Sequence, residues 1–175
     1  MFDKNRVLAA AKRFMDGGTD AAAFHQELTR ILAEEMGCTR ASLWIYADPL
    51  SRDRIECASL YDRTDAAWSS GATLSDTDFA PYFEAMRTDN LIVAGDARAH
   101  PVTACFNEVY FDPLGIVSLL DVGINVGGEP WGLFCCENTT DILDWSESHV
   151  DYLRQVGSLI GYALRKAQTG TPVTA

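Results

Sequence analysis

The stretch from Ile116 to Asn138, IVSLLDVGINVGGEPWGLFCCEN, decides the fold of this 175-residue chain. Two strand-like runs flank Gly127-Gly128, and a glycine doublet accepts the positive φ angles of a two-residue hairpin turn. Side chains alternate between the two faces of a strand, so counting outward from the turn fixes which residues share a face. That count predicts one face of the hairpin that includes Ser118, Leu120, Cys135 and Glu137.

The other face of this hairpin carries Gly123 and Gly132, which we predict to pair with each other. Two glycines leave a hollow without side chains, and a helix needs such a hollow in order to lie close on a sheet. We therefore assign this second face to helices and leave the face with Ser118 and Glu137 open to other segments.

Helical patterns lie at both ends of the chain. Residues 3–15, 20–36 and 146–166 place apolar side chains at the spacing of one helix face. Between them, period-two alternation predicts strands at residues 40–46 and 54–61, and a short apolar run predicts another at 91–94. The expected class is α+β, an antiparallel sheet with the terminal helices on one face.

Composition indicates one domain with a sizeable core, since 47% of the residues are hydrophobic and 22% are charged. We divide residues 1–175 into an N-terminal helix (1–18), a core (19–167) and a flexible tail (168–175). The net charge of −11 disfavours nucleic acid and anionic membranes as partners. No apolar run reaches the ~20 residues of a membrane helix, and five cysteines without regular spacing fit a reducing compartment, so we expect a cytoplasmic protein.

The segments Gly115–Ile124 and Pro130–Asn138, then Trp145 and a long final helix, resemble the second half of a GAF domain, a sensory module related to the PAS fold. The segments at 92–101 and 106–114 are similar to the linking region of GAF modules in bacterial sensor kinases and diguanylate cyclases. The resemblance covers about residues 20–167. This sequence departs from it at Gly123, where Pro is common, and at Cys136 and Asn138, where His is frequent, which weakens a metal or haem interpretation.

The resemblance implies a ligand pocket on the sheet face opposite the terminal helices, roofed by the irregular middle segments. The residues expected to bind a ligand there are Trp44, Tyr46, Tyr61, Phe83, Asp96, Phe106, Tyr110, Ser118, Leu120, Cys135 and Glu137. Each also has a structural interpretation. The aromatic rings suit an ordinary core, Asp96 suits a turn cap, Glu137 can lie in water at a strand end, and Ser118 can bond to roof backbone.

An enzymatic alternative rests on Cys105, five residues after His100. Free methionine sulfoxide reductases are GAF-fold enzymes that use pocket-loop cysteines, but their cysteine pattern does not match this chain residue by residue. A thiol nucleophile also needs a thiolate stabilised by a nearby cation or helix N-terminus. Cys135 and Cys136 are adjacent in a strand, so they point to opposite faces and cannot hold one metal ion. We expect no catalytic and no metal-binding residues.

The preferred function is a non-catalytic sensor that binds a small molecule of unknown identity and signals to an output elsewhere. Apolar residues off the main helical stripes favour a homodimer through the terminal helices: Val7, Phe14, Leu159 and Tyr162. Two alternatives stay open: the thiol enzyme, and a dimerisation module without a ligand.

Overall fold

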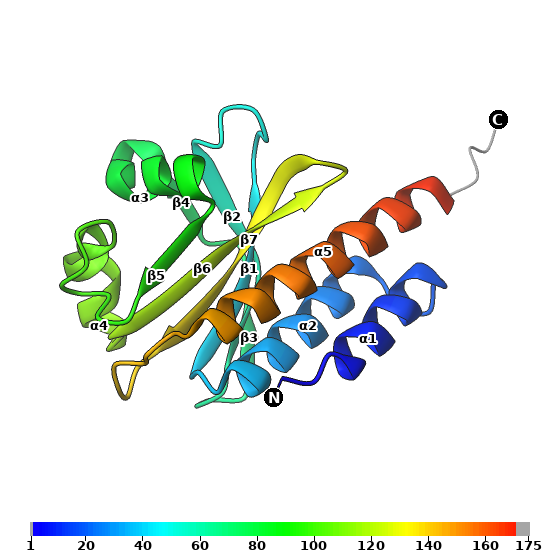
Figure 1. Ribbon diagram of the computed structural model, residues 1–175, viewed down its shortest axis with the longest axis horizontal. Coiled ribbons are helices and arrows are strands. Elements are labelled where there is room, and N and C mark those ends of the chain that lie inside the picture. The colour runs from blue at the N-terminus through cyan, green and yellow to red at the C-terminus, as the bar shows by residue number, and fades with distance from the viewer. Residues whose placement is uncertain (1, 171–175) are drawn as a thin grey trace.

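A computed structural model describes residues 2–170, and a seven-stranded antiparallel sheet forms its centre (Figure 1). The strands run in the order β3 (Ala67–Ser69), β2 (Arg54–Asp62), β1 (Arg40–Tyr46), β7 (Glu129–Asn138), β6 (Ser118–Val126) and β5 (Leu91–Ala94). Strand β4 (Thr73–Ser75) pairs with the other end of β2. The central strands β1, β7 and β6 are buried over most of their length, which means that both faces of the sheet are covered there.

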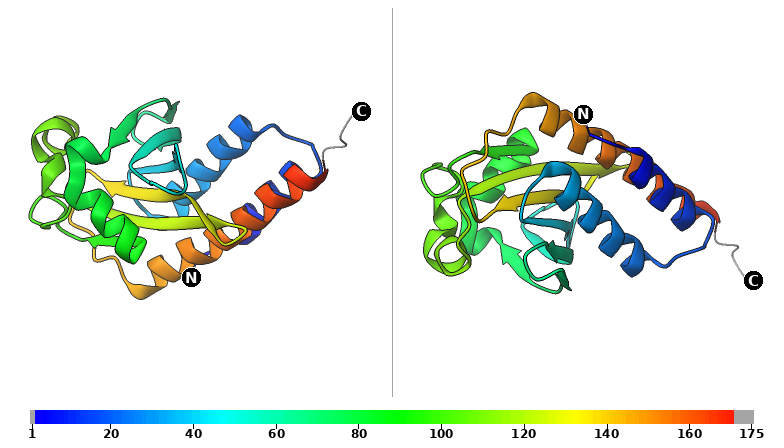
Figure 2. Two further views of the ribbon diagram at one scale, coloured as in Figure 1. Left: turned by 90° about the horizontal axis from the view of Figure 1, so that it is seen from above. Right: turned by 90° about the horizontal axis from the view of Figure 1, so that it is seen from below.

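Helices α2 (Ala21–Met36) and α5 (Glu147–Gly170) cover one face of the sheet, and α1 (Asn5–Met15) packs against both of them on the side away from the sheet (Figures 1 and 2). Helix α2 begins where the Asp20 carboxylate accepts a 2.8 Å hydrogen bond from the Ala23 amide, and it ends at Gly37 with φ +66°. We call the apolar layer beneath these helices the helix-side core; its members include Phe24, Leu28, Leu120, Phe134 and Leu153.

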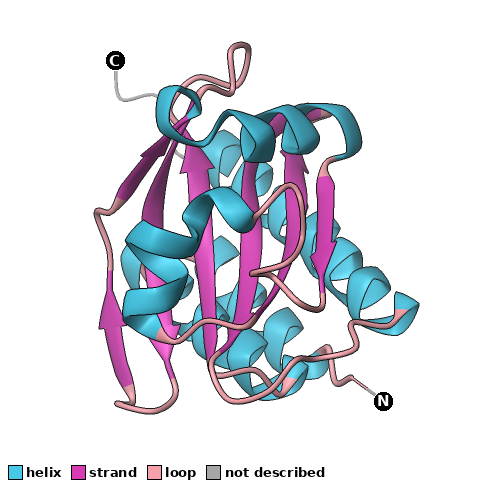
Figure 3. Cartoon of the chain, turned by 90° about the vertical axis from the view of Figure 1, so that its left-hand side faces the viewer, coloured by secondary structure: helices cyan, strands magenta, loops and turns pink. Residues whose placement is uncertain are grey.

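Short and irregular helices cover the opposite face, as Figure 3 shows from that side. They are α3 (Asp76–Asp89), the 3₁₀ turn η1 (Ala104–Phe106), the π-helical turn η2 (Asn107–Phe111) and α4 (Asp112–Leu114). We call these segments the roof, and the apolar layer beneath them the roof-side core, which includes Trp44, Phe83, Phe106, Leu119 and Leu133. The predicted α+β class, with terminal helices on one face and an irregular roof on the other, is confirmed.

The glycine turn forms as predicted, with φ +65° at Gly127 and +94° at Gly128. The strand register beyond it differs from the prediction, because the pairing shifts by one residue between Ile124 and Asn125. Ile124 pairs with Gly132 and Asn125 with Pro130, so Trp131 is the extra residue of a β-bulge. A shift of one residue turns every later side chain of one strand to the other face.

Because of the bulge, the side chains of β6 point to the faces opposite to those predicted, whereas those of β7 point to the predicted faces. Ser118 pairs with Asn138, and Leu119 pairs with Glu137. Leu120 belongs to the helix-side core, so the prediction that it shares a face with Glu137 was wrong. The same correction applies to Ser118, whose Oγ accepts a 3.3 Å hydrogen bond from the Leu143 amide.

A second bulge interrupts the pairing of β1 with β2. Leu43 pairs with Ser59 and Trp44 with Cys57, so Ala58 is the extra residue. Ser59 then faces α2, where its Oγ lies 3.1 Å from Thr29 Oγ1. Tyr61 follows Ser59 onto the helix side and packs in the helix-side core, so its predicted place at the ligand pocket was wrong.

The sheet glycines Gly123 and Gly132 make room for Asn90 and for the backbone of β1, and not for a helix. A Cβ at Gly132 would lie 2.1 Å from the carbonyl oxygen of Trp44, and one at Gly123 would overlap the Asn90 side chain. The close approach of α5 depends instead on its own Gly161, where a Cβ would lie 2.4 Å from the Asn125 carbonyl oxygen. The predicted glycine hollow beneath a helix was therefore wrong.

Some of the apolar side chains that were expected at a dimer interface are packed inside the chain itself. Val7 is fully buried, and the Phe14 ring stacks on Phe24 with centroids 4.6 Å apart. Leu159 is partly buried against the helix-side core, whereas Tyr162 is 60% exposed.

Residues 168–170 of the expected tail belong to α5, and residues 171–175 lie outside the described part. No helix among the described residues is long and apolar enough to cross a membrane.

Candidate functional site: a chamber between sheet and roof

A small cavity lies between the sheet and the roof, and we call it the chamber. Aromatic and aliphatic side chains make most of its wall, together with two carboxylates. Its lining residues are Trp44, Leu74, Tyr82, Phe106, Tyr110, Phe111, Leu119, Asp121, Cys135 and Glu137. The space open to the centre of a water molecule is about 20 Å³, which is room for about one water. The chamber is therefore closely filled by its own side chains.

Asp121 is a carboxylate in the middle of β6, and it is only 1% exposed. Its Oδ2 accepts a 2.5 Å hydrogen bond from the Tyr82 hydroxyl of α3. Its Oδ1 is buried and has no hydrogen-bond partner among the described residues. Burial raises the pKa of Asp121 to about 7, although the nearby Cys135 thiol and the Tyr82 hydroxyl favour the ionised form. A thiol is a weak donor, so this carboxylate keeps an unused acceptor.

Glu137 lies on the neighbouring strand β7, two residues beyond Cys135, which pairs with Asp121. Its hydrogen-bond and ion-pair partners differ from those of Asp121. Its Oε2 accepts a hydrogen bond from the Tyr110 hydroxyl at 3.2 Å and lies 3.6 Å from Arg40 Nη1. The Arg40 guanidinium also lies over the Tyr110 ring, 5.6 Å from its centroid. Burial raises the pKa of Glu137, and the positive charge of Arg40 opposes that rise. Glu137 therefore has a compensating cation.

Cys135 lies between the two carboxylates, since it pairs with Asp121 and precedes Glu137. Burial and the two neighbouring negative charges raise the pKa of its thiol well above the ordinary value. Cys135 is therefore a neutral thiol. Cys136 belongs to the helix-side core, which confirms that these adjacent cysteines point to opposite faces.

Five of the predicted binding residues line the chamber: Trp44, Phe106, Tyr110, Cys135 and Glu137. Tyr46 and Phe83 are buried in the roof-side core without lining the cavity. Asp96 accepts a 3.1 Å hydrogen bond from the Ala99 amide, so it has the turn-capping role that was its structural alternative.

The sequence prediction missed Asp121, Tyr82 and Arg40, which with Glu137 and Tyr110 supply the charged and hydroxyl groups of this site. The available signal was the composition of β6, SLLDVGINV, where one acid interrupts an apolar strand. A carboxylate in such a run needs a specific partner when buried.

Cys105 lies in η1 and packs against the roof-side core. Its thiol is 3.5 Å from the Val102 carbonyl oxygen, to which it donates a hydrogen bond. Burial raises the pKa of this thiol. A raised pKa disfavours the thiolate that nucleophilic chemistry requires.

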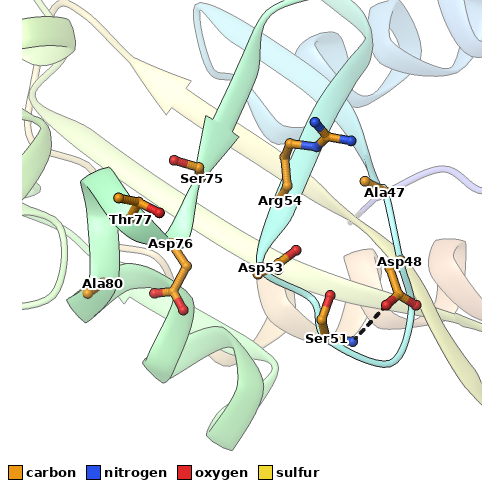
Figure 4. A pocket seen from close by; sticks show the side chains of 9 residues that line it. All are labelled: Ala47, Asp48, Ser51, Asp53, Arg54, Ser75, Asp76, Thr77 and Ala80. Carbon is orange, nitrogen blue, oxygen red and sulfur yellow. Dashed lines mark hydrogen bonds between the residues drawn. The ribbon is translucent and has the colours of Figure 1, made fainter.

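A larger hollow of about 810 Å³ opens to solvent beside the β1–β2 loop and the start of α3 (Figure 4). Its carboxylates include Asp48, Asp53 and Asp76. Asp48 accepts hydrogen bonds from the Leu50 and Ser51 amides, so it stabilises the loop. Asp53 is exposed, and Asp76 at the start of α3 already forms a 3.0 Å ion pair with Arg87. The buried chamber is therefore the better candidate site.

Comparison with known proteins places the chain in a family. The model of the GAF domain matches residues 20–164. No curated protein matches the sequence. Among solved structures, the phycocyanobilin-bound GAF domain from a cyanobacterial phytochrome has a TM-score of 0.75 at 13% identity, covering 97% of each chain.

Two further structures show the same fold. The GAF domain of a phosphoenolpyruvate-protein phosphotransferase from Coxiella burnetii has a TM-score of 0.67 at 12% identity, covering 95% of this chain and 97% of that one. The PixJ GAF domain of Thermosynechococcus elongatus, in its blue-light absorbing form, has a TM-score of 0.67 at 17% identity, covering 85% of each. These TM-scores establish a shared fold, and the family match over residues 20–164 establishes that this chain belongs to the GAF domain family.

Proposed function

We propose that this GAF domain is a non-catalytic sensory module, that its chamber binds a small organic molecule, and that its terminal helices relay the occupied state. The observation that carries this proposal is the unpartnered Oδ1 of Asp121 in the chamber wall. Burying an acceptor without a hydrogen bond costs free energy. A ligand that supplies the missing donor recovers that cost.

The sheet offers a direct route from the chamber to the terminal helices. On β6, Asp121 faces the chamber, while its neighbours Leu120 and Val122 pack in the helix-side core. Helix α5 lies close on this hairpin, with Gly161 against the backbone of Asn125. A ligand shifts the packing of α5 if it binds one arrangement of the hairpin more tightly than the other.

The terminal helices also offer a surface for a second copy of the chain. Leu8 on α1 is 48% exposed and Tyr162 on α5 is 60% exposed, and the two helices lie alongside each other (Figure 2). We assign this surface to a homodimer, placed in the cytoplasm and acting on an output domain or protein. Light scattering after size-exclusion chromatography should give twice the mass of one chain for the wild-type protein. The double variant Leu8→Glu, Tyr162→Glu should give the mass of a single chain. A monomeric wild-type protein at micromolar concentration would contradict the dimer.

Native mass spectrometry of the purified protein tests ligand binding. We expect an adduct of one small molecule for each chain, which disappears when the protein is denatured. The closely filled chamber favours the alternative of a dimerisation module without a ligand, and that alternative gives bare chain masses even after incubation with a cell extract. Bare masses would therefore refute the sensory proposal.

Enzymatic activity is tested separately. The substitution Cys105→Ser should leave any slow reduction of free methionine sulfoxide unchanged, because the thiol of Cys105 is held in its neutral form by burial. Loss of a measurable reductase activity in this variant would favour the thiol enzyme.

A further inference from the structure

We infer that the chamber takes a ligand with a cationic nitrogen group, such as an amidine or an amine, carried on a flat apolar body, and that Asp121 Oδ1 accepts a hydrogen bond from that group. This inference rests on the proposed function and names the class of ligand. It depends on three features of the chamber: an unused acceptor, an uncompensated charge and an aromatic wall.

The first feature is the acceptor itself. Tyr82 occupies Oδ2 of Asp121, and Oδ1 is left buried without a partner. An ionised carboxylate is acceptor-only, so the group that completes it must be a donor. Above its pKa of about 7 the carboxyl is ionised, and ligands that present only acceptors at this point, carboxylates and phosphates among them, then leave Oδ1 unsatisfied.

The second feature is the charge balance of the wall. The chamber contains two carboxylates, Asp121 and Glu137, and Arg40 pairs with Glu137. Among residues 2–170, no lysine, arginine or histidine forms an ion pair with Asp121. A buried carboxylate without a cation is unfavourable, so a positively charged donor is favoured over a neutral one.

The third feature is the aromatic wall. The rings of Trp44, Phe106 and Tyr110 line the same cavity as Asp121. The Phe106 ring meets Tyr82 edge to face, with centroids 5.1 Å apart. Aromatic faces attract cations and pack against flat apolar groups. An amidinium or ammonium on an aromatic body matches both the carboxylate and the rings.

Entry of such a ligand requires roof side chains to move, because the chamber has room for about one water. The roof is irregular where it meets the chamber. Helix α3 is interrupted at Phe79, with φ −131° and ψ 45°, and Phe79 stacks on Phe106 at 4.3 Å. Tyr110 belongs to the π-helical turn η2, and such turns are frequent at functional sites.

The pH dependence of binding follows from the groups that face Asp121. These are Tyr82 from α3, Tyr46 from β1, and Cys135 and Glu137 from β7. The hydroxyls and the thiol are neutral at ordinary pH, and Glu137 is compensated by Arg40. Asp121 is therefore the group that ionises near neutrality, at a pKa of about 7. A cationic probe should bind more tightly above this pH than below it.

The test uses three probes of nearly one shape: benzamidinium, neutral benzamide and anionic benzoate. Their affinity is measured by isothermal titration calorimetry with the wild-type protein and with Asp121→Asn, at about pH 6 and about pH 8. Asp112→Asn is the matched control, because Asp112 is an exposed roof residue outside the chamber. Circular dichroism checks that each variant is folded.

We expect wild-type protein at about pH 8 to prefer benzamidinium over benzamide and to bind benzoate least. Loss of one charge-assisted hydrogen bond corresponds to roughly a 10- to 100-fold weaker affinity, so Asp121→Asn should lose benzamidinium binding by that factor while Asp112→Asn keeps it. Affinity should also fall between about pH 8 and about pH 6 as Asp121 is protonated.

Equal affinity of wild-type protein and Asp121→Asn for benzamidinium would overturn the inference, as would tighter binding of benzoate. Neither result bears on whether a small molecule co-purifies with the chain, so the proposed sensory function is still decided by native mass spectrometry. Absence of binding by all three probes at millimolar concentration would also overturn the inference. The adduct seen by native mass spectrometry then decides the proposed function on its own.

Discussion

Replacing Asp121 with Asn should stabilise the ligand-free protein, and the gain should depend on pH. Burial raises the pKa of this carboxyl from 3.8 to about 7. A group whose pKa is raised on folding contributes stability below its unfolded pKa and loses it as the pH rises through the folded value. The difference from 3.8 to about 7 corresponds to an upper limit of roughly 4 kcal/mol. The asparagine amide cannot ionise, and its oxygen can still accept the Tyr82 hydrogen bond.

The assay is urea unfolding of wild-type protein and Asp121→Asn, followed by circular dichroism at several pH values. The variant should exceed the wild type by roughly 2–4 kcal/mol at about pH 8, and the difference should shrink toward zero at about pH 4. Other titrating groups are common to both proteins and cancel in the difference. Asp112→Asn, at an exposed position, should change stability little at either pH. A variant that is equal to or less stable than the wild type at about pH 8 would refute the reasoning about Asp121.

Two further predictions concern packing and charge. Gly161→Ala should destabilise the protein by about 1–3 kcal/mol, because the new methyl group would meet the Asn125 carbonyl oxygen. Gly157→Ala is its control: its methyl group meets only ordinary contacts at 3.7 Å or more, so thermal unfolding should show a gain of up to about 1 kcal/mol. Arg40→Met should cost about 3 kcal/mol in urea unfolding at neutral pH by leaving Glu137 buried without a cation, and less in acid, where Glu137 is protonated. Equal losses at both pH values would contradict the role assigned to Arg40.

The helices, strands and layers of this fold could be predicted from sequence because they depend on patterns that many residues share. The glycine doublet fixes the turn, and the apolar stripes of the terminal helices need one sheet face to cover. Both Cys135 and Glu137 of β7 were placed on the correct face, since the roof-side core and the helix-side core alternate along that strand. These features do not depend on any single contact.

The composition of the site could not be predicted because it depends on two single residues. Trp131 in β7 and Ala58 in β2 are each extra residues of a bulge, and a period-two count passes through a bulge without detecting it. Because of the bulge at Trp131, Asp121 rather than Ser118 faces the chamber. Because of the bulge at Ala58, Tyr61 lies on the helix side of the sheet. Bulges are decided by packing against neighbouring segments, which local sequence does not contain.

Asp121 and Glu137 share one chamber wall, and the difference between them is the basis of the ligand class inferred above. Arg40 and Tyr110 satisfy Glu137 from within the chain, so that carboxylate holds the wall together. Asp121 accepts a hydrogen bond from the Tyr82 hydroxyl on one oxygen, its other oxygen has no partner among the described residues, and no cation of those residues pairs with it, so a donor from outside would stabilise its ionised form further. Since Leu120 and Val122 on either side of it pack beneath α5, a change in its charge acts one residue away from the helix contacts. The fold is common to many GAF domains, and under the proposed function the uncompensated carboxylate of this one would join ligand chemistry to the terminal helices.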